Sequence, residues 1–390
     1  MRILIVNYEF PPIGGGGGKA SYNLARELVR HGYRVDVLTS RIKGQRAREV
    51  LDGITVYRVM SWRKGIHDCG FRGALTFLFF AVLPFLGLTR QNHYDVIHYF
   101  FGQPSGILAL LPGAQRKTPY IISLRGSDVP GYDEYNWSLQ QAHRLVLSAT
   151  KKIWSRAAAL TSVTGSLKNT ALQTFPDAEI SVIPNGVDSI FFKSSNLTGR
   201  QDKRFKLISV ARLVERKGIQ DVLRALAELN DPELSLLIVG TGNYADRLRK
   251  LCGNLSLNGT VSFYGFCHPR KLPGLMGDSD AFILPSRAEA FGNVFAEAMA
   301  CGLPVIGSDV GGIPDLIDTT NGILVKPGDI EMIKRAIVKI KTSKTLRASM
   351  GAANRKKMMA DYTWESIGNR YVSVYEDVRK KGNQFALHRP

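Results

Sequence analysis

Short apolar runs alternate with amphipathic helical patterns along most of the chain. Each run stops near a glycine, a proline or a polar residue, which is typical of a buried strand. The pattern predicts strands at residues 3–6, 35–38, 94–100, 119–123, 159–164, 180–183, 205–210, 236–239, 261–266, 281–284 and 305–307. Strands that alternate with helices build open parallel sheets, which bind ligands at the carboxyl ends of their strands. We therefore predict an α/β fold.

The length of the chain and one polar stretch indicate two domains. With 390 residues the chain is too long for one ordinary domain and comfortable for two. Residues 189–204 are mostly polar, with Ser194-Ser195-Asn196 and Gly199, so we expect a linker there. The predicted domains are residues 1–188 and 205–363, and residues 364–390 begin with the pattern of an amphipathic helix.

A basic run stands directly before a strongly apolar segment. Residues 41–72 carry eight basic and three acidic side chains, and residues 73–88 are almost entirely apolar. That segment is short for a transmembrane helix and contains Pro84. Two interpretations stay open: a packed helix of the first domain, or a helix that enters a membrane interface beside the basic run.

The formal net charge of +19 narrows the class of partner. A positive field attracts nucleic acid, anionic lipid surfaces or nucleotide phosphates. We find no helix-turn-helix, zinc-finger or RNA-binding signature, so we expect no nucleic acid partner. The cysteines Cys69, Cys252, Cys267 and Cys301 have neither metal-ligand nor redox-pair spacing. We therefore expect a reduced cytoplasmic protein, with peripheral attachment to an anionic membrane surface left open.

A glycine-rich loop follows the first predicted strand. Residues 14–18 are all glycine, and the helical pattern that follows ends at Gly32. Without side chains, the backbone N–H groups of Gly15, Gly16 and Gly17 can approach a bulky anion at a helix N-terminus. The loop lacks the Gly-x-Gly-x-x-Gly pattern and the acid that closes the second strand, which disfavours nicotinamide binding. A flexible linker between strand and helix is the alternative interpretation of the five glycines.

A second loop carries two carboxylates on a strand–loop–helix unit. The strand at residues 281–284 is followed by Glu289 on a loop and Glu297 within a predicted helix. We predict Asn293 as the N-cap of that helix. Its amino end suits a phosphate, and a carboxylate on the second turn can accept hydrogen bonds from a diol such as that of ribose. An ordinary βα unit with two solvated acids would show the same pattern.

A third loop, after the strand at 205–210, carries Arg212 and Lys217. The Arg fork and the Lys point charge can meet an anion from two sides. A solvated basic turn is the alternative.

These motifs resemble those of the family-four retaining glycosyltransferases. Glu289 and Glu297 have seven residues between them, inside Pro-Ser-Arg-x-Glu-x-Phe-Gly and before Ala-Cys-Gly-Leu-Pro-Val. Ile-Pro-Asn-Gly-Val-Asp at 183–188 is also similar to the family, and the resemblance spans nearly the whole chain. It implies the GT-B fold, in which two Rossmann-like open parallel-sheet domains face each other across a cleft. The last helix, within 364–390, would then pack back on the first domain.

The resemblance also implies the roles of individual residues. It places Arg212 and Lys217 on the donor diphosphate and Glu289 on the donor sugar, and we take these three as catalytic. It places Gly15, Gly16, Gly17, Phe291, Gly292, Asn293 and Glu297 at the donor, with Glu297 on the ribose. Arg125 stands where many relatives have a histidine that touches the donor sugar. We predict that Arg125 also binds the donor, through its sugar or a phosphate, although the departure puts the inherited sugar preference in doubt. No metal and no cofactor are expected, because Arg212 and Lys217 neutralise the leaving diphosphate.

The predicted function is that of a retaining glycosyltransferase, which moves a sugar from a nucleotide-diphosphate sugar to a hydroxyl acceptor. A glycan or lipid-linked acceptor, in cell-surface polysaccharide or glycolipid synthesis, is what the resemblance implies. Two alternatives stay open: a GT-B nucleotide-sugar 2-epimerase and a non-catalytic nucleotide-sugar-binding protein. The base, the sugar and the acceptor do not follow from the residues.

Overall fold

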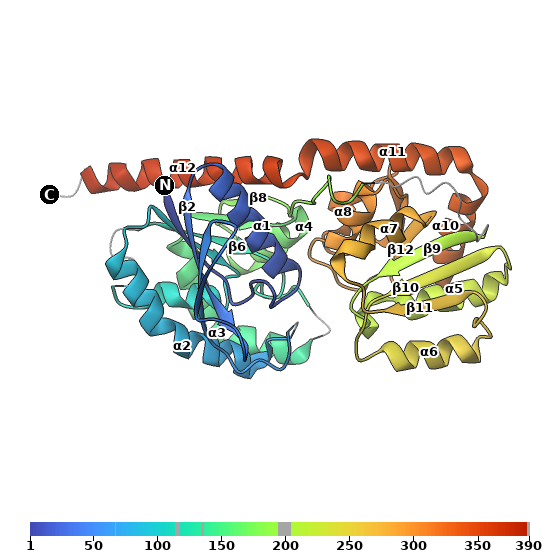
Figure 1. The fold of residues 1–390 in the computed structure, drawn as a ribbon, viewed down its shortest axis with the longest axis horizontal. Helices are drawn as coiled ribbons and strands as arrows, with labels where there is room; N and C mark the ends of the chain where they lie inside the picture. The colour runs from blue at the N-terminus through green and yellow to red at the C-terminus, as the bar shows by residue number, and fades with distance from the viewer. Residues whose placement is uncertain (67, 114–117, 134–135, 194–203, 388–390) are drawn as a thin grey trace. The chain divides into compact units, whose positions relative to one another are not determined.

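The computed structural model describes residues 1–66, 68–113, 118–133, 136–193 and 204–387, with side chains to residue 381. The chain forms two compact units, one of residues 1–186 with the segment from Trp364 onward, the other of residues 187–363 (Figure 1). Val187 belongs to the second unit because its N–H donates to the Tyr362 carbonyl (2.7 Å) and it bridges Thr363. The predicted first domain ended two residues later, at 188, and most of the predicted linker, 194–203, lies outside the described residues.

The first unit is built on an eight-stranded sheet in which only the edge strand β3 runs antiparallel. Its strand order is β3 (Arg48–Leu51), β4 (Ile54–Met60), β2 (Arg34–Arg41), β1 (Arg2–Val6), β5 (Val96–Phe100), β6 (Tyr120–Leu124), β7 (Ala159–Ser162) and β8 (Ile180–Val182). The chain moves outward from β1 to β2 and β4 and then crosses back to β5 on the other side of β1. The strand order therefore reverses between β1 and β5.

Helices cover both faces of this sheet. They are α1 (Gly16–Arg30), α2 (Gly70–Gln91), α3 (Trp137–Ser155), α4 (Gly165–Thr174) and α12 (Trp364–Leu387), with a 3-10 helix at Ser105–Leu110. Right-handed crossovers place α1 and α2 on opposite faces, because the chain moves in opposite directions along the sheet through them. The last helix, α12, returns to the first unit and lies beside α1 (Figure 1). A Cβ on Gly368 of α12 would lie 2.9 Å from the Cβ of Glu27 on α1, so the two helices pack closely there.

The second unit is built on a six-stranded sheet that is parallel throughout. Its strand order is β11 (Val261–Gly265), β10 (Leu234–Val239), β9 (Phe205–Val210), β12 (Ala281–Leu284), β13 (Val305–Ser308) and β14 (Gly322–Val325). Its helices are α5 (Ile219–Leu229), α6 (Ala245–Asn254), α7 (Leu272–Gly277), α8 (Asn293–Ala300), α9 (Ile313–Leu316), α10 (Ile330–Thr342) and α11 (Lys344–Asp361), with 3-10 helices at Glu215–Lys217 and Pro269–Lys271. Here the strand order reverses between β9 and β12.

The apolar segment predicted at 73–88 is the centre of helix α2, and it packs on the first unit. The buried residues of α2 are Gly73, Phe77, Ala81, Phe85 and Leu88, which recur every three or four residues and share one face. The helix is long and apolar enough to cross a membrane, and 28% of its most apolar 18-residue stretch is buried in the protein. The packed-helix interpretation is therefore confirmed for this face.

Candidate functional site

The second unit offers a ligand site at the point where its strand order reverses. In an open parallel sheet, the loops after the two strands at such a point diverge to opposite faces and leave a crevice at their carboxyl ends. The two strands are β9 and β12, which pair directly. Arg212 and Lys217 follow β9, and Glu289 follows β12. The topology thus brings together three residues that are as far as 77 positions apart in sequence, from Arg212 to Glu289.

Lys217 and Glu289 form an ion pair across this switch point. Their side chains are mostly covered, with 14% and 17% of their surfaces exposed. Arg212 is exposed, and within the described residues no hydrogen-bond or ion-pair partner meets its guanidinium. The loops therefore present a positive group free for an anion beside a carboxylate that is already held by a lysine.

The backbone fixes the positions of both loops. Gly218 adopts a left-handed conformation (φ +71°), and a Cβ there would lie 1.9 Å from the carbonyl oxygen of Pro285. Directly beside it, the Arg287 N–H donates to the Arg216 carbonyl (2.7 Å), which ties the loop after β12 to the loop after β9. Because only glycine can make this close approach, the site depends on its presence.

Glu289 is held from the opposite side by the loop after β13. The Gly312 N–H donates to the Glu289 carbonyl at 3.0 Å. The adjacent Gly311 is also left-handed (φ +52°), and a Cβ there would lie 2.0 Å from the same carbonyl oxygen. The carboxylate of Glu289 is therefore mounted on a backbone fixed by two neighbouring loops.

The amino end of α8 adjoins this carboxylate, and its cap differs from the prediction. Gly292 is the N-cap, with φ +83° and no side-chain capping bond, and Asn293 is the first helical residue. The prediction of Asn293 as N-cap was wrong because the sharp turn into α8 needs a left-handed residue, which glycine adopts at least cost. The first turn of α8 contains no acidic residue, so its dipole stays available to an anion.

Phe291 and Glu297 lie on either side of that helix start. Phe291 is buried at 4% exposure and stacks on Tyr362, with 6.3 Å between ring centroids. It therefore anchors the loop in the core of the second unit. Glu297 is half-buried on the second turn of α8. Burial, and after it the nearby charge of Glu297, raise the pKa of the Cys301 thiol to about 12.

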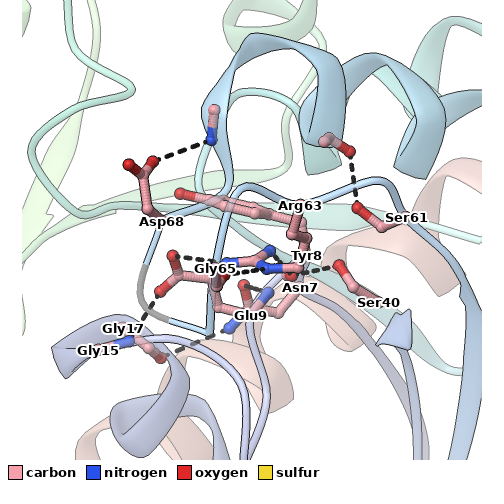
Figure 2. A network of polar contacts seen from close by, with 12 residues as sticks. Asn7, Tyr8, Glu9, Gly15, Gly17, Ser40, Ser61, Arg63, Gly65 and Asp68 are labelled. Carbon is pink, nitrogen blue, oxygen red and sulfur yellow. Dashed lines mark hydrogen bonds and ion pairs between the residues drawn. The ribbon is translucent and has the colours of Figure 1, made fainter. Parts of the chain in front are cut away.

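The glycine loop lies at the corresponding switch point of the first unit, after β1. Gly15 caps α1, and its N–H donates to the Glu9 carboxylate at 3.2 Å (Figure 2). Gly16 is the first residue of α1. A Cβ on Gly17 would lie 2.5 Å from the ring of Phe101, in the loop after β5. Gly17 is therefore needed for close packing of two loops.

Sequence reasoning missed the side chains that brace this loop. The Asn7 amide accepts from the Glu9 N–H (3.0 Å) and donates to Ser21 (2.8 Å). Arg63 has 1% of its side chain exposed, donates to the Tyr8 carbonyl (3.1 Å) and lies 3.7 Å from the Glu9 carboxylate (Figure 2). The position of Asn7 and Glu9 directly after β1, at the carboxyl edge, was the signal that could have found them.

Arg125, which we predicted at the donor, makes its contacts inside the first unit. The residue is buried at 8% exposure, and its Nη atoms donate to Asn185 (2.6 Å) and to the hydroxyl of Tyr371 on α12 (2.9 Å). The guanidinium also lies over the Phe100 ring, 4.3 Å from its centroid. These contacts assign Arg125 to the attachment of α12 and remove the support for donor contact.

In the described part of the chain, no group of three His, Cys, Asp or Glu side chains is arranged to hold a metal ion. The Asp-x-Asp at 278–280 precedes β12, at the amino edge of the sheet. There Asp278 pairs with Lys206 at 2.5 Å, and Asp280 accepts from the Lys206 N–H at 2.7 Å.

Comparison with known proteins agrees with this arrangement. The family model described as glycosyl transferase 4-like domain matches residues 15–186, and the model described as glycosyl transferases group 1 matches residues 191–357. An uncharacterized glycosyltransferase of Methanocaldococcus jannaschii is 30% identical over 96% of this chain and 98% of its own length. A GDP-mannose-dependent monoacylated alpha-(1-6)-phosphatidylinositol monomannoside mannosyltransferase of Corynebacterium glutamicum is 28% identical, with the same coverage.

A solved structure shows the same fold at low identity. Sucrose-phosphate synthase from Thermosynechococcus elongatus aligns with a TM-score of 0.84 and 23% identity, over 97% of this chain and 99% of that one. Two parallel-sheet units with these switch points are the GT-B architecture. The chain therefore belongs to the group 1 glycosyl transferases, a GT4-type family of glycosyltransferases with the GT-B fold.

Proposed function

We propose that the protein transfers a sugar from a nucleotide-diphosphate sugar to a hydroxyl acceptor, with retention of the anomeric configuration and without a metal. The observation that carries this proposal is the Lys217–Glu289 pair at the β9/β12 switch point, beside exposed Arg212 and the amino end of α8. These groups supply positive charge for a diphosphate and a carboxylate for sugar hydroxyls within one small region.

The roles follow from where charge develops. As the bond between the anomeric carbon and the phosphate oxygen breaks, the electron pair goes to the diphosphate, whose growing charge Arg212, Lys217 and the α8 dipole stabilise. The acceptor hydroxyl attacks the oxocarbenium-like carbon on the same face. Its proton goes to the departing phosphate oxygen, so no protein nucleophile is needed. Glu289 orients the sugar hydroxyls.

The donor nucleoside has its own contact in this proposal. Glu297 is a half-buried carboxylate one turn beyond the amino end of α8, at a distance along the helix suited to a ribose when the diphosphate lies at that end. A carboxylate accepts from both hydroxyls of a diol. In the first unit, Gly15 and Gly16 at the start of α1 offer backbone N–H groups suited to an anion.

The relatives supply candidate donors and acceptors. The C. glutamicum relative is by its name GDP-mannose-dependent and acts on a phosphatidylinositol mannoside. A lipid-linked or glycan acceptor in glycolipid or polysaccharide synthesis is the class that we carry over to this chain. All four cysteines are free, so we place the protein in the reducing cytoplasm.

The test combines donor binding with product analysis. The full chain is screened by thermal shift against UDP-, GDP- and ADP-sugars, because a ligand at a hundred times its dissociation constant adds about 2.7 kcal/mol. The stabilising donor is then incubated with candidate acceptors, with and without EDTA, and the product is examined by NMR. We expect an α-linked product from an α-linked donor, unchanged by EDTA. Inversion of the anomeric configuration would refute a retaining mechanism. Activity that EDTA abolishes and Mg²⁺ restores would refute metal independence. An epimerised donor formed without acceptor would identify a 2-epimerase instead.

A further inference from the structure

Helix α2 has a second apolar face that the core of the first unit does not use. Its buried face is described above, and a row of large side chains stands opposite it in steps of four residues. Their exposed fractions are 68% for Phe71, 50% for Leu75, 75% for Phe79 and 79% for Leu83. We call these four residues the outer stripe. Residues four apart lie on one side of a helix, so the outer stripe is continuous.

Positive charge accompanies the outer stripe, and negative charge is absent from the helix. Residues 70–91 contain Arg72 and Arg90 and no Asp or Glu. Both arginines are exposed. At 100° per residue, both point within about 40° of the mean direction of the outer stripe. Such a face, apolar along its length and cationic at both ends, is complementary to an anionic lipid surface.

A cavity of about 740 Å³ lies beside the amino-terminal part of α2. Its lining includes the cationic residues Arg41, Lys43 and Arg63 and the apolar residues Met60, Trp62 and Ile66, and it contains no carboxylate. Trp62, Met60 and Ile66 are 56%, 47% and 46% exposed. The lining is fastened to α2, because Ser61 donates to the Gly73 carbonyl (2.8 Å) and the Trp62 N–H donates to Thr76 (2.9 Å).

Arg63 gives the cavity an unused buried donor. Its Nη2 is buried and makes no hydrogen bond within the described residues, although it lies 3.7 Å from a Glu9 carboxylate oxygen. A buried donor without an acceptor costs free energy, which an entering anionic oxygen would recover. Arg63 also belongs to the network that braces the glycine loop (Figure 2). An anion in the cavity would therefore lie near the loop of the proposed site.

We propose that the outer stripe and this cavity together form a docking surface for an anionic lipid bilayer. The stripe enters the boundary between headgroups and acyl chains, and the cavity takes an anionic headgroup through Arg41, Lys43 and Arg63. A second copy of the chain is disfavoured as the occupant, because it would bring the same arginines together. The proposal concerns attachment and does not depend on the donor chemistry, so vesicle binding tests it separately from transfer.

The experiment measures sedimentation of the full chain with vesicles. One set contains phosphatidylcholine with about one third phosphatidylglycerol, which gives the vesicles a negative surface potential like that of an anionic leaflet. The other set contains phosphatidylcholine alone. We expect binding to the first set that weakens as salt rises, with little binding to the second. The variant Phe79→Ser/Leu83→Ser tests the outer stripe, and Lys43→Glu tests the cavity. Each should reduce the partition coefficient by roughly tenfold or more.

Matched controls come from α3 of the same unit. Leu145→Ser removes a side chain that is 83% exposed, and Lys151→Glu reverses an exposed charge outside the cavity lining. Both should bind like the wild type. Arg63 is a poor probe, because its buried side chain braces the fold. All variants should keep the wild-type thermal midpoint, since the altered side chains are exposed.

Three results would overturn the proposal: no binding to anionic vesicles, equal binding to neutral ones, or wild-type binding by the folded stripe variant. Loss of binding by the stripe variant together with wild-type binding by Lys43→Glu would refute the role of the cavity. If the stripe variant instead abolished self-association of the free protein, measured by analytical ultracentrifugation, the stripe would be an interface between copies of this chain.

Discussion

The loops at the two switch points, after β1 in the first unit and after β9 and β12 in the second, are held in place in different ways. In the first unit, side chains brace the glycine loop: Asn7, Glu9 and Arg63 bond to one another and to the backbone. In the second unit, left-handed glycines and backbone hydrogen bonds fix the loops, and Gly218 and Gly311 touch carbonyl oxygens. The loops there thus need no charged side chain to hold them: Arg212 is exposed, and Lys217 pairs with Glu289. Under the proposed function, the second unit would carry the charge chemistry and the first a shaped backbone surface.

The largest expected effect is a loss of turnover that distinguishes a lysine acting on the donor from a lysine in a structural ion pair. Lys217→Ala should reduce turnover by about 10²–10³-fold, because it removes one group that stabilises the leaving diphosphate. Its matched control is Lys206→Ala, which breaks the Lys206–Asp278 pair of similar exposure at the opposite edge of the same sheet. Steady-state kinetics should show little change for the control. Equal losses in both variants would mean that Lys217 acts only through stability.

A methyl group added at two different glycines should have different effects on stability. Gly218→Ala should lower the free energy of unfolding by about 2–4 kcal/mol. The alanine would have to adopt the left-handed conformation of Gly218, and its Cβ would also clash with the carbonyl oxygen of Pro285. Gly87→Ala should be tolerated, since Gly87 lies within helix α2 of the first unit and no atom lies within 4 Å of the new Cβ. Denaturant unfolding followed by circular dichroism measures both. A stable Gly218→Ala protein would contradict the proposed dependence on that glycine.

A smaller effect concerns the nucleoside. Glu297→Ala should weaken donor binding by about 1.5–3 kcal/mol, the usual worth of a hydrogen bond to a charged group. Isothermal titration calorimetry with the stabilising nucleotide gives the value directly. Glu365→Ala, on α12 of the other unit, serves as the matched change. Unaltered nucleotide affinity in Glu297→Ala would remove the ribose assignment and leave the Lys217–Glu289 region untouched.

The smallest expected effect is a difference in acid sensitivity between the units. His98 is fully buried between Tyr375 and Ser123, and burial, followed by the charge of Arg125, lowers its pKa well below the usual value. The unfolded chain therefore binds a proton that the folded unit excludes. The stability of the first unit should fall as the pH drops below about 6.5, the ordinary histidine pKa.

In the second unit the resolved carboxyl pKa values are also lowered, but these groups titrate at lower pH than a histidine. The pKa of Asp231 is lowered by its hydrogen bond to Lys341, and that of Asp318 by its bond to Thr320, so their stabilisation is lost only in stronger acid. Trp62, Trp137, Trp154 and Trp364 are the only tryptophans of the chain, and all belong to the first unit. Tryptophan fluorescence at graded pH thus reports that unit alone. A midpoint unchanged between pH 7 and 5.5 would contradict the prediction for His98.

The sequence by itself determined the alternation of strands and helices and the loops that carry chemistry. Apolar runs such as residues 281–284 can only be buried, and parallel strands place the residues that follow them at one edge. The sequence could therefore place Arg212, Lys217 and Glu289 on loops at such an edge, whereas their roles at a donor came from the resemblance and stay a prediction. It also predicted a helix over 73–88 but left its packing open. The hairpin of β3 and β4 was missed, because its strands lie inside a basic run and β3 is largely exposed at the sheet edge.

Only the tertiary structure decided where individual side chains point. Arginine side chains are usually exposed, so nothing in the sequence indicated that Arg125 would be buried. It is buried because it donates hydrogen bonds to Asn185 and Tyr371, which lie 60 and 246 residues further along the chain. The pairing of Lys217 with Glu289 across 72 residues likewise depends on strand order. In α2, periodicity predicts a helix but cannot tell its buried face from the outer stripe, because both are apolar. Local sequence sets backbone preference and average burial, whereas partners distant in sequence set direction and contact.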